Sequence, residues 1–328
     1  AFGMNSLYYN TTGSYNTAHG QESLFNNTTA SNNTAVGYQS LYSNLTGDNN
    51  VAVGWKALLA NTTGLSNSAV GLNALLSNTS GGSNVAMGQQ ALQANTTASR
   101  NTAVGYQAGY TNATGPYNIF VGHKAGYSAT TGGNLFIGDS AGYSCTTGDA
   151  NTIIGTISSA GVNPAGYSLT TGSFNSFIGG ASGNSNTTGS YNVALGNYSL
   201  NSNTTASGST AVGYQAGYSN TTGTQNIAVG YRALYSGVTA GGNIGIGENT
   251  LYNTTGNDNI AIGAACGYNT TTGTANTFIG GGTNGVSGGP GVANTTGSYN
   301  TANGYNSLYY NFGGNYNTAN GYNSLYHN

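Results

Sequence analysis

Charge is nearly absent from this sequence. Its 328 residues include 4 Lys or Arg, 6 Asp or Glu and 3 His, and charged residues make up 3% of the chain, against about 25% in typical globular proteins. A formal net charge of −2 provides no basic surface, so we expect no nucleic-acid partner. No apolar run approaches the roughly 18 residues of a membrane-spanning helix, so we also expect no membrane insertion by this segment.

Groups that carry out chemistry are equally scarce. Cys145 and Cys266 occupy different repeat positions and are expected to stay unpaired. The acidic residues are too few and too irregularly placed for calcium-binding repeats or for the paired carboxylates of a glycosidase. The histidines His19, His123 and His327 are isolated in sequence, and His19 is expected to be structural. We therefore expect no catalytic, cofactor or metal site, and a hydrolase is only our third hypothesis.

Glycine, by contrast, is abundant and regularly spaced. The chain has 56 Gly, and one of them closes each AVG-like triplet; we call this glycine position 0 and number the other positions from it. It recurs at Gly3, Gly20, Gly37, Gly54, Gly71, Gly88, Gly105, Gly122, Gly138, Gly155, Gly179, Gly196, Gly213, Gly230, Gly247, Gly263, Gly280, Gly304 and Gly321. The spacing is 17 except for two gaps of 16 and two of 24. A fixed period this short, without heptads, indicates a solenoid.

Each repeat has a strand-like half and a turn-like half. Residues such as Thr34-Ala35-Val36 have the alternation of a short β-strand, and we expect the apolar residue at position −1 to face the interior. Position −4 is Asn in nearly every repeat, which predicts a ladder of stacked amides. The NTTG stretch supplies turn residues. The sequence predicts an all-β parallel β-solenoid of about 19 coils, with residues 1–328 forming a single repeat array.

Two positions vary together in a way that predicts their contact. Where position +4 is Leu, the next position −2 is small, as in Leu41 and Ala52; where +4 is Gly, the next −2 is often large, as in Gly109 and Phe120. Close packing tolerates exchanges that conserve volume, so these positions are expected to share one space. Two pairs break the rule and predict loose packing or a filled void: Gly183 with Ala194, and Gly217 with Ala228.

The NTAVG or NVAVG core, followed by a small residue three places later, resembles the head repeats of trimeric autotransporter adhesins. Related repeats with NTTG turns occur in bacteriophage tail-fibre proteins. The resemblance spans Gly3 to Gly321 and implies a left-handed parallel β-roll, a homotrimer and an adhesive role outside the cell. The repeat is longer than the usual adhesin head repeat, and the chain shows no basic neck motif, heptad stalk or membrane anchor. Because the chain starts in mid-repeat, we expect it to be a fragment of a longer fibre.

The two spacings of 24 predict loop insertions near residues 156–172 and 281–297. Insertions in solenoids leave the coil as surface loops, and such loops often bind partners. The candidate receptor-binding residues are Asn163, Pro164, Asn284 and Pro290. Harmless decoration is the alternative. Near the C-terminus the apolar position −1 becomes Asn303 and Asn320, so coils 300–328 are polar. They are interpreted as a transition toward a cap, a change of fold or a contact with the next subunit.

The turn also contains recurrent N-x-T sequons. They place candidate glycosylation sites at Asn10, Asn61, Asn95, Asn186, Asn203, Asn220, Asn253, Asn269 and Asn294. The favoured interpretation is structural, since Asn-Thr-Thr-Gly makes a good corner and repetition alone would generate every sequon. Ice binding by the threonine rows is a further alternative, disfavoured because these threonines lie beside turn glycines instead of on a flat strand face.

These observations favour a shaft over an enzyme. Tyr and Trp recur at positions +1 and +5, and some of these aromatic rows are expected to lie between chains. We expect an extracellular, non-enzymatic shaft or adhesin, foremost part of a phage tail fibre or virion appendage. Its partners would be copies of itself and a host-surface glycan or protein receptor. The alternative is a bacterial trimeric adhesin or an extracellular structural filament, with or without glycans.

Overall fold

A computed structural model gives the fold of the chain and describes residues 1–155, 163–283 and 286–328. The described residues contain 18 strands and no helix. They form two compact units, Ala1–Thr156 with Ser168–Thr171 and Ile157–Tyr167 with Gly172–Asn328. Each unit is a parallel β-solenoid in which one coil contributes one three-residue strand. The predicted fold class, an all-β parallel β-solenoid, is therefore confirmed.

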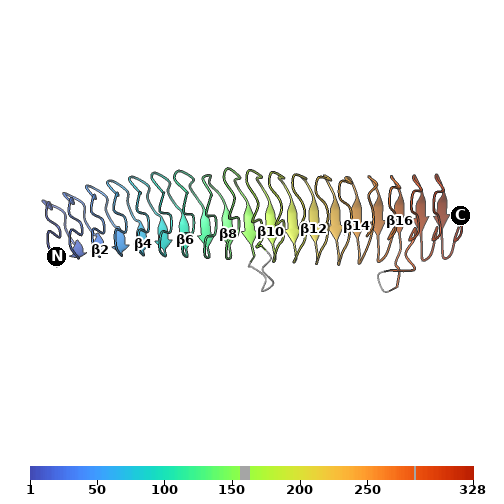
Figure 1. Cartoon of the computed structure of the whole chain (residues 1–328), viewed down its shortest axis with the longest axis horizontal. Coiled ribbons are helices and arrows are strands. Elements are labelled where there is room, and N and C mark those ends of the chain that lie inside the picture. The colour runs from blue at the N-terminus through green and yellow to red at the C-terminus, as the bar shows by residue number, and fades with distance from the viewer. Residues whose placement is uncertain (156–162, 284–285) are drawn as a thin grey trace. The chain divides into compact units, whose positions relative to one another are not determined.

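Unit 1 contains the first nine strands, which lie side by side in Figure 1. They pair in parallel and in register, so that Ala35 lies opposite Ala18 and Ala52. The strands are β1 (Thr17–His19), β2 (Thr34–Val36), β3 (Val51–Val53), β4 (Ser68–Val70), β5 (Val85–Met87), β6 (Thr102–Val104), β7 (Ile119–Val121), β8 (Leu135–Ile137) and β9 (Thr152–Ile154).

Unit 2 repeats the arrangement. Its strands also pair in parallel and in register, for example Ala211 with Ala228. They are β10 (Ser176–Ile178), β11 (Val193–Leu195), β12 (Thr210–Val212), β13 (Ile227–Val229), β14 (Ile244–Ile246), β15 (Ile260–Ile262), β16 (Thr277–Ile279), β17 (Thr301–Asn303) and β18 (Thr318–Asn320).

The prediction that position −1 faces the interior is wrong. In every strand the middle residue, at position −2, is the buried one, as in Ala35, Ala103 and Phe120. Alternate strand residues point to opposite faces, so the side chain at −1 points outward together with that at −3. The pattern was ambiguous because both −1 and −2 are apolar. The interior of a 17-residue coil is narrow, which explains why the smaller of the two usually lies inside.

The predicted contact between positions +4 and −2 is confirmed. A methyl group added to Gly109 would lie 2.5 Å from Cδ2 of Phe120 in the next coil, and one on Gly267 would lie 2.9 Å from Cδ2 of Phe278 in the next coil. Each buried Phe also touches the glycine of its own coil. Gly183 follows this rule, since its added methyl would lie 2.6 Å from Phe177. The space beside Gly183 is therefore filled by Phe177 of the same coil, which is the second of the two outcomes that the sequence predicted.

Gly217 is a true exception, as predicted. Leu200 lies on one side of Gly217, but Ala211 and Ala228 at the neighbouring −2 positions are both small. A cavity of about 10 Å³ remains, and its lining includes Gly217, Ala228, Gly237 and Thr254. Such a volume accommodates about one water molecule. The hydroxyl of Thr254 is buried without a protein partner. The residues that line this cavity all belong to unit 2.

The asparagine ladder at position −4 exists, but its bonds differ from those expected. The side-chain oxygen of Asn50 accepts the backbone N–H of Asn67 at 2.9 Å, and the Asn50 amide donates to the Gly64 carbonyl at 2.8 Å. The ladder thus joins side chain to backbone as well as amide to amide. It satisfies backbone groups where the chain turns, which an apolar residue would leave unpaired.

A second ladder stands at the corner, at position +7. Asn44 donates to the side-chain oxygen of Asn27 at 2.9 Å and to the carbonyl of Gly47 at 2.9 Å. The same pair of bonds recurs at Asn61 and Asn78. These asparagines are buried, so a large share of each narrow core consists of hydrogen-bonded amides instead of apolar side chains.

Each coil also uses left-handed backbone at non-glycine residues. At positions +2, +4 and −5 the φ angle is close to +55°, as in Gln39 (54°), Leu41 (52°) and Arg100 (62°). This region costs an L-residue roughly 1–2 kcal/mol and is worst for β-branched side chains. No Val, Ile or Thr adopts it in the described residues, although Thr is abundant in the sequence. The corner geometry therefore accounts for the residues found at these positions.

Candidate functional site

The outward face of the sheet carries an apolar side chain in most coils of each unit. We call the side chains at positions −1 and −3 of the strands the sheet stripe. In unit 1 its most exposed members are Val51, Val70, Met87, Val104 and Ile119, each 37–45% exposed. In unit 2 they are Ile178, Val193, Leu195, Ile227, Ile246, Ile262 and Ile279, in the same range. Contiguous exposed apolar patches commonly mark interaction surfaces.

Polar side chains end the sheet stripe. Position −1 is His19 in β1 and Asn303 and Asn320 in β17 and β18, and all three are exposed. The predicted polar coils at 300–328 therefore change the outer surface of the sheet, not the core. The core of these coils is preserved, since Ala302 and Ala319 remain buried.

Aromatic side chains form stacked rows along the coils. At position +5 the rings of Tyr110 and Tyr127 stack at 5.1 Å with an interplanar angle of 2°. Tyr235 and Tyr252 stack at 4.9 Å and 9°. Stacking covers the ring faces with neighbours of the same chain, which leaves mainly edges and hydroxyls at the surface. Inside a row, these tyrosines are unavailable for face-on stacking with a sugar.

Three of the four cations lie at position +2 beside these rows. The ammonium of Lys56 lies 4.4 Å from the centroid of Trp55, and Lys124 lies 5.8 Å from that of Tyr127. Arg232 lies between Tyr231 and Tyr235 at 5.2 and 5.4 Å. Such cation–π contacts hold a charged side chain against an aromatic surface. The fourth cation, Arg100, lies at position −5 on a different part of the coil.

The insertion residues predicted to bind a receptor are placed differently from one another. Asn163 is exposed, whereas Pro164 and Pro290 are buried at positions +2 and +3 of the coil. Asn284 lies outside the described residues. The prolines therefore belong to the coil where it resumes, and the extra residues of the longer repeats precede them. Buried prolines offer no surface to a receptor.

Most of the sequon asparagines are also buried. Asn61, Asn95, Asn186, Asn203, Asn220 and Asn294 are at most 3% exposed. Their side-chain nitrogen points into the coil, where it bonds a carbonyl; in Asn61 this is the carbonyl of Gly64 at 3.0 Å. A folded coil has no room for a glycan on these six. The structural interpretation of the corner asparagine is thus supported at these positions.

The other three sequons lie nearer the surface. Asn10, Asn253 and Asn269 are half-buried. Asn253 and Asn269 stand at position +6, one residue before the corner position, which is taken by Thr254 and Thr270. The shift explains their exposure, and it shows that the sequons do not all share one position in the coil.

Both thiols are buried and free. Cys145 replaces the corner asparagine, and its thiol donates to the carbonyl of Gly148 at 3.4 Å, as the asparagine amide does in other coils. Cys266 lies 3.0 Å from the carbonyl oxygen of Gly280. Burial raises the pKa of each thiol to about 12. The expectation that the two cysteines stay unpaired is confirmed.

This burial predicts slow alkylation. At pH 9 a thiol with a pKa of 9.0 is half ionised, whereas one with a pKa of about 12 is almost fully protonated. Iodoacetamide should therefore modify the folded chain at least about a hundredfold more slowly than the urea-unfolded chain. Because the folded pKa exceeds the unfolded value, the contribution to stability is complete below pH 9 and falls as the pH rises towards 12. Equal alkylation rates in the two states, measured by mass spectrometry, would contradict the buried placement.

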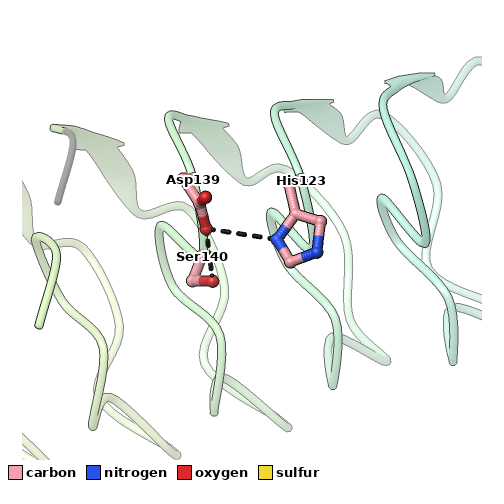
Figure 2. Close-up of polar contacts among 3 residues, drawn as sticks. All are labelled: His123, Asp139 and Ser140. Carbon is pink, nitrogen blue, oxygen red and sulfur yellow. Dashed lines mark hydrogen bonds and ion pairs between the residues drawn. The ribbon is translucent and has the colours of Figure 1, made fainter.

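Figure 2 shows one cluster of polar side chains on neighbouring coils, His123, Asp139 and Ser140. Nδ1 of His123 lies 3.3 Å from Oδ1 of Asp139, and the hydroxyl of Ser140 donates to that same oxygen at 2.7 Å. The His123 and Asp139 side chains are 49% and 42% exposed. A nucleophilic serine would instead donate to the histidine. This cluster therefore lacks the arrangement of a catalytic triad, and the Tyr106 ring stacks on His123 at 5.4 Å.

The other histidines contact aromatic rings. His19 packs edge-on against Phe2 at 5.1 Å, and His327 stacks on Tyr310 at 5.0 Å. Within residues 1–155, 163–283 and 286–328, no three His, Cys, Asp or Glu side chains are grouped closely enough to hold a metal ion. No helix among these residues has the length and apolarity needed to cross a membrane.

The exposed sheet stripe and the row of half-exposed aromatic edges are thus the main surfaces that the coil pattern builds. The stripe was not predicted as an exposed surface, because position −1 was expected inside. The signal that could have located it is the asparagine at −4, which shares a face with −2 and not with −1. No protein family, curated protein or solved structure matches this chain.

Proposed function

We propose that the chain is a non-enzymatic shaft segment of an extracellular fibre, part of a phage tail fibre or similar virion appendage, whose copies assemble through the sheet stripe. The observation that carries the proposal is the stripe itself. Side chains such as Met87 and Leu195, each 45% exposed, recur once per coil on a face with almost no charge. Covering such a surface with a second apolar surface removes it from water and lowers the free energy.

The occupant that suits this surface best is another copy of the same chain. A parallel solenoid presents its side chains at one strand spacing of about 4.8 Å, and only a surface with that same spacing matches it coil by coil. Copies related by closed symmetry present identical patches to one another. The resemblance to trimeric adhesin repeats favours three copies. Assembly of this type yields a fibre, which would carry surfaces for a host glycan or protein receptor.

A second candidate function is a cell-surface trimeric adhesin or an extracellular structural filament. The half-buried sequons at Asn10, Asn253 and Asn269 favour it, because a glycan there would require less disruption of the coil than at the buried sequons. Both functions use the same assembly and place the chain outside the cell. They differ in what the fibre is attached to.

The assembly is tested by placing charge on the stripe. In Met87→Glu/Val104→Glu, two neighbouring coils of unit 1 carry a carboxylate where the strands β5 and β6 face outward. Because both side chains are already partly in water, the coil should still fold, while contact between copies becomes unfavourable. We expect the wild-type chain to sediment as a multiple of 32.8 kDa and the variant to sediment at 32.8 kDa.

The control carries the same charge elsewhere. Thr29 and Thr46 are exposed at position +9 of unit 1, so Thr29→Glu/Thr46→Glu adds two carboxylates away from the sheet. This variant should sediment as the same multiple of 32.8 kDa as the wild-type chain. A wild-type chain that sediments as a single copy at micromolar concentration would refute assembly through the stripe.

A further inference from the structure

Unit 1 has a groove at the corner of its coils, which we call the corner groove. One wall is the hydroxyl row Thr63, Ser80, Thr97 and Thr114, and the other carries Arg100 and Tyr117. Its volume is about 530 Å³, and an adjoining hollow of about 600 Å³ shares Thr114 and Tyr117 with it. The groove therefore extends across several coils, along the direction in which they stack.

Arg100 is the only cation at this part of the coil and is held in place within the groove. Its Nη1 donates to the hydroxyl of Tyr117 at 2.8 Å, and its guanidinium carbon lies 5.4 Å from the centre of that ring. A guanidinium has five N–H donors, so four remain for a ligand. Their planar arrangement suits a carboxylate, which can accept two parallel hydrogen bonds.

Two residues that line the groove also have backbone N–H groups without their usual acceptor. At position −6 the backbone N–H commonly donates to a side-chain oxygen of the next coil, as Gly82 does to the hydroxyl of Ser99 at 3.0 Å. Leu65 and Ser99 also occupy position −6, and the residues at that position in the coils that follow them are Gly82 and Pro116, respectively. Neither residue has a side-chain oxygen. The N–H groups of Leu65 and Ser99, two residues that line the groove, therefore lack that acceptor.

We infer that the corner groove binds an acidic saccharide, with a sugar carboxylate on Arg100 and sugar hydroxyls along the threonine row. The hydroxyl row matches a hydroxyl-rich ligand, because each hydroxyl both donates and accepts. The ring of Tyr117 is 58% exposed and offers an apolar surface to the sugar. The row repeats at about 4.8 Å per coil, comparable with the advance per residue of an extended polysaccharide.

Unit 2 provides an internal contrast. Its hollow at the same positions is lined by Thr222 and Thr239 on one side and by Gln225 and Asp258 on the other. The wall that carries a guanidinium in unit 1 carries a carboxylate here. A carboxylate ligand would be repelled by Asp258, as it would be by Asp149 in the adjoining hollow of unit 1. The sugar carboxylate should therefore bind beside Arg100 in the corner groove of unit 1 and not in unit 2.

The inference depends on the proposed function, since it names the class of host-surface ligand, and calorimetry on the full chain tests it. The probes are hexamers of galacturonate, guluronate and sialic acid, each compared with its neutral methyl ester. At least one acidic hexamer should bind at least about tenfold more tightly than its ester. Arg100→Gln should weaken that binding by at least about tenfold, and Tyr117→Phe should weaken it less. Arg232→Gln, which removes a cation at position +2, should leave it unchanged.

Three results would overturn the inference: no acidic hexamer binds, the ester binds as well as the acid, or Arg100→Gln binds like the wild type. Thermal unfolding of each variant shows whether a loss of binding is caused by misfolding. Because Arg100 is exposed, we expect Arg100→Gln to fold like the wild type. The sedimentation mass separates this inference from the proposed function. A chain that assembles but binds no acidic saccharide refutes only the inference, and a single copy that binds one refutes only the assembly.

Discussion

Replacing Gly88 with alanine is expected to lower the free energy of unfolding of unit 1 by about 3–5 kcal/mol. Gly88 has a φ of +135°, a region that is costly for any residue with a side chain. An added Cβ would also overlap the carbonyl oxygen of Gly105 in the next coil. Because that atom belongs to the backbone, the clash cannot be relieved by rotating a side chain. The two adjacent coils must separate or distort.

The effect should be large because a solenoid is stabilised by contacts between neighbouring coils. Disrupting one interface in the middle of unit 1 weakens the coupling between the coils on either side. Urea unfolding followed by circular dichroism gives the free energy, and hydrogen exchange at β5 and β6 locates the change. Loss of protection in these two strands is the expected signature.

Gly82→Ser is the control for this substitution. Gly82 lies in the same coil, but its φ is not in the left-handed region, and the next coil already has Ser99 at the same position. The serine should therefore be tolerated, with a change within about 1 kcal/mol. If Gly88→Ala unfolds at the same urea concentration as Gly82→Ser, the close approach of coils at position 0 is wrong.

The second large effect is expected for Asn67→Ala, which should lower the free energy of unfolding by about 3–5 kcal/mol. Asn67 is fully buried, and its amide donates to the side chain of Asn50 and to the carbonyl of Gly81. Its side-chain oxygen accepts the backbone N–H of Asn84 at 3.0 Å. Alanine leaves the N–H of Asn84 buried without this partner, which costs about 1–3 kcal/mol. It also removes the bonds to Asn50 and Gly81, although the Gly81 carbonyl keeps the amide of Asn78 as a donor.

Asn67→Ser is the matched variant, because the chain itself has a serine at this position in unit 2. The hydroxyl of Ser209 accepts the backbone N–H of Asn226 at 3.3 Å, so a serine keeps one of the ladder bonds. We expect it to lose about half as much stability as alanine does. Equal losses for alanine and serine would show that the ladder acts through packing and not through hydrogen bonds.

Much of the fold could be predicted from the sequence because each coil repeats the same local chemistry. The spacing of the position 0 glycines located every described strand, and the exchange of Leu41 and Ala52 for Gly109 and Phe120 located a packing contact between coils. Volume is conserved in close-packed interiors, so such exchanges report contact reliably. The same reasoning placed the cavity beside Gly217.

The direction of the strand residues could not be predicted in the same way. A three-residue strand with apolar residues at both −1 and −2 has two acceptable orientations, and the sequence pattern does not choose between them. The width of the coil interior determines the orientation, because the narrow interior accommodates Ala35 more readily than Val36. The left-handed residues at +2, +4 and −5 were also missed, since Gln39 and Leu41 give no sign of this backbone. Only the lack of β-branched residues there marks it.

The candidate sites were harder to predict than the fold. From the sequence, Pro164 and Pro290 are expected in exposed loops, but both are buried where the coil resumes. The sequon asparagines allowed a glycan or a structural corner, and the favoured structural interpretation holds where their amides complete a buried ladder. In both cases the same local motif is compatible with an exposed and with a buried position, and the coil geometry determines which one occurs. The sheet stripe and the corner groove arise from the stacking of coils and have no counterpart in any single repeat.

Cryo-electron microscopy of the native particle that carries this chain tests the central claim most directly. The account predicts three copies packed through their sheet stripes into a fibre that is joined to a capsid or tail. A single unpaired copy, with the stripes of β5 and β6 facing solvent, would contradict assembly. A free filament of chains joined end to end, or sugar density on Asn10, Asn253 or Asn269, would contradict the virion appendage and favour the extracellular structural filament.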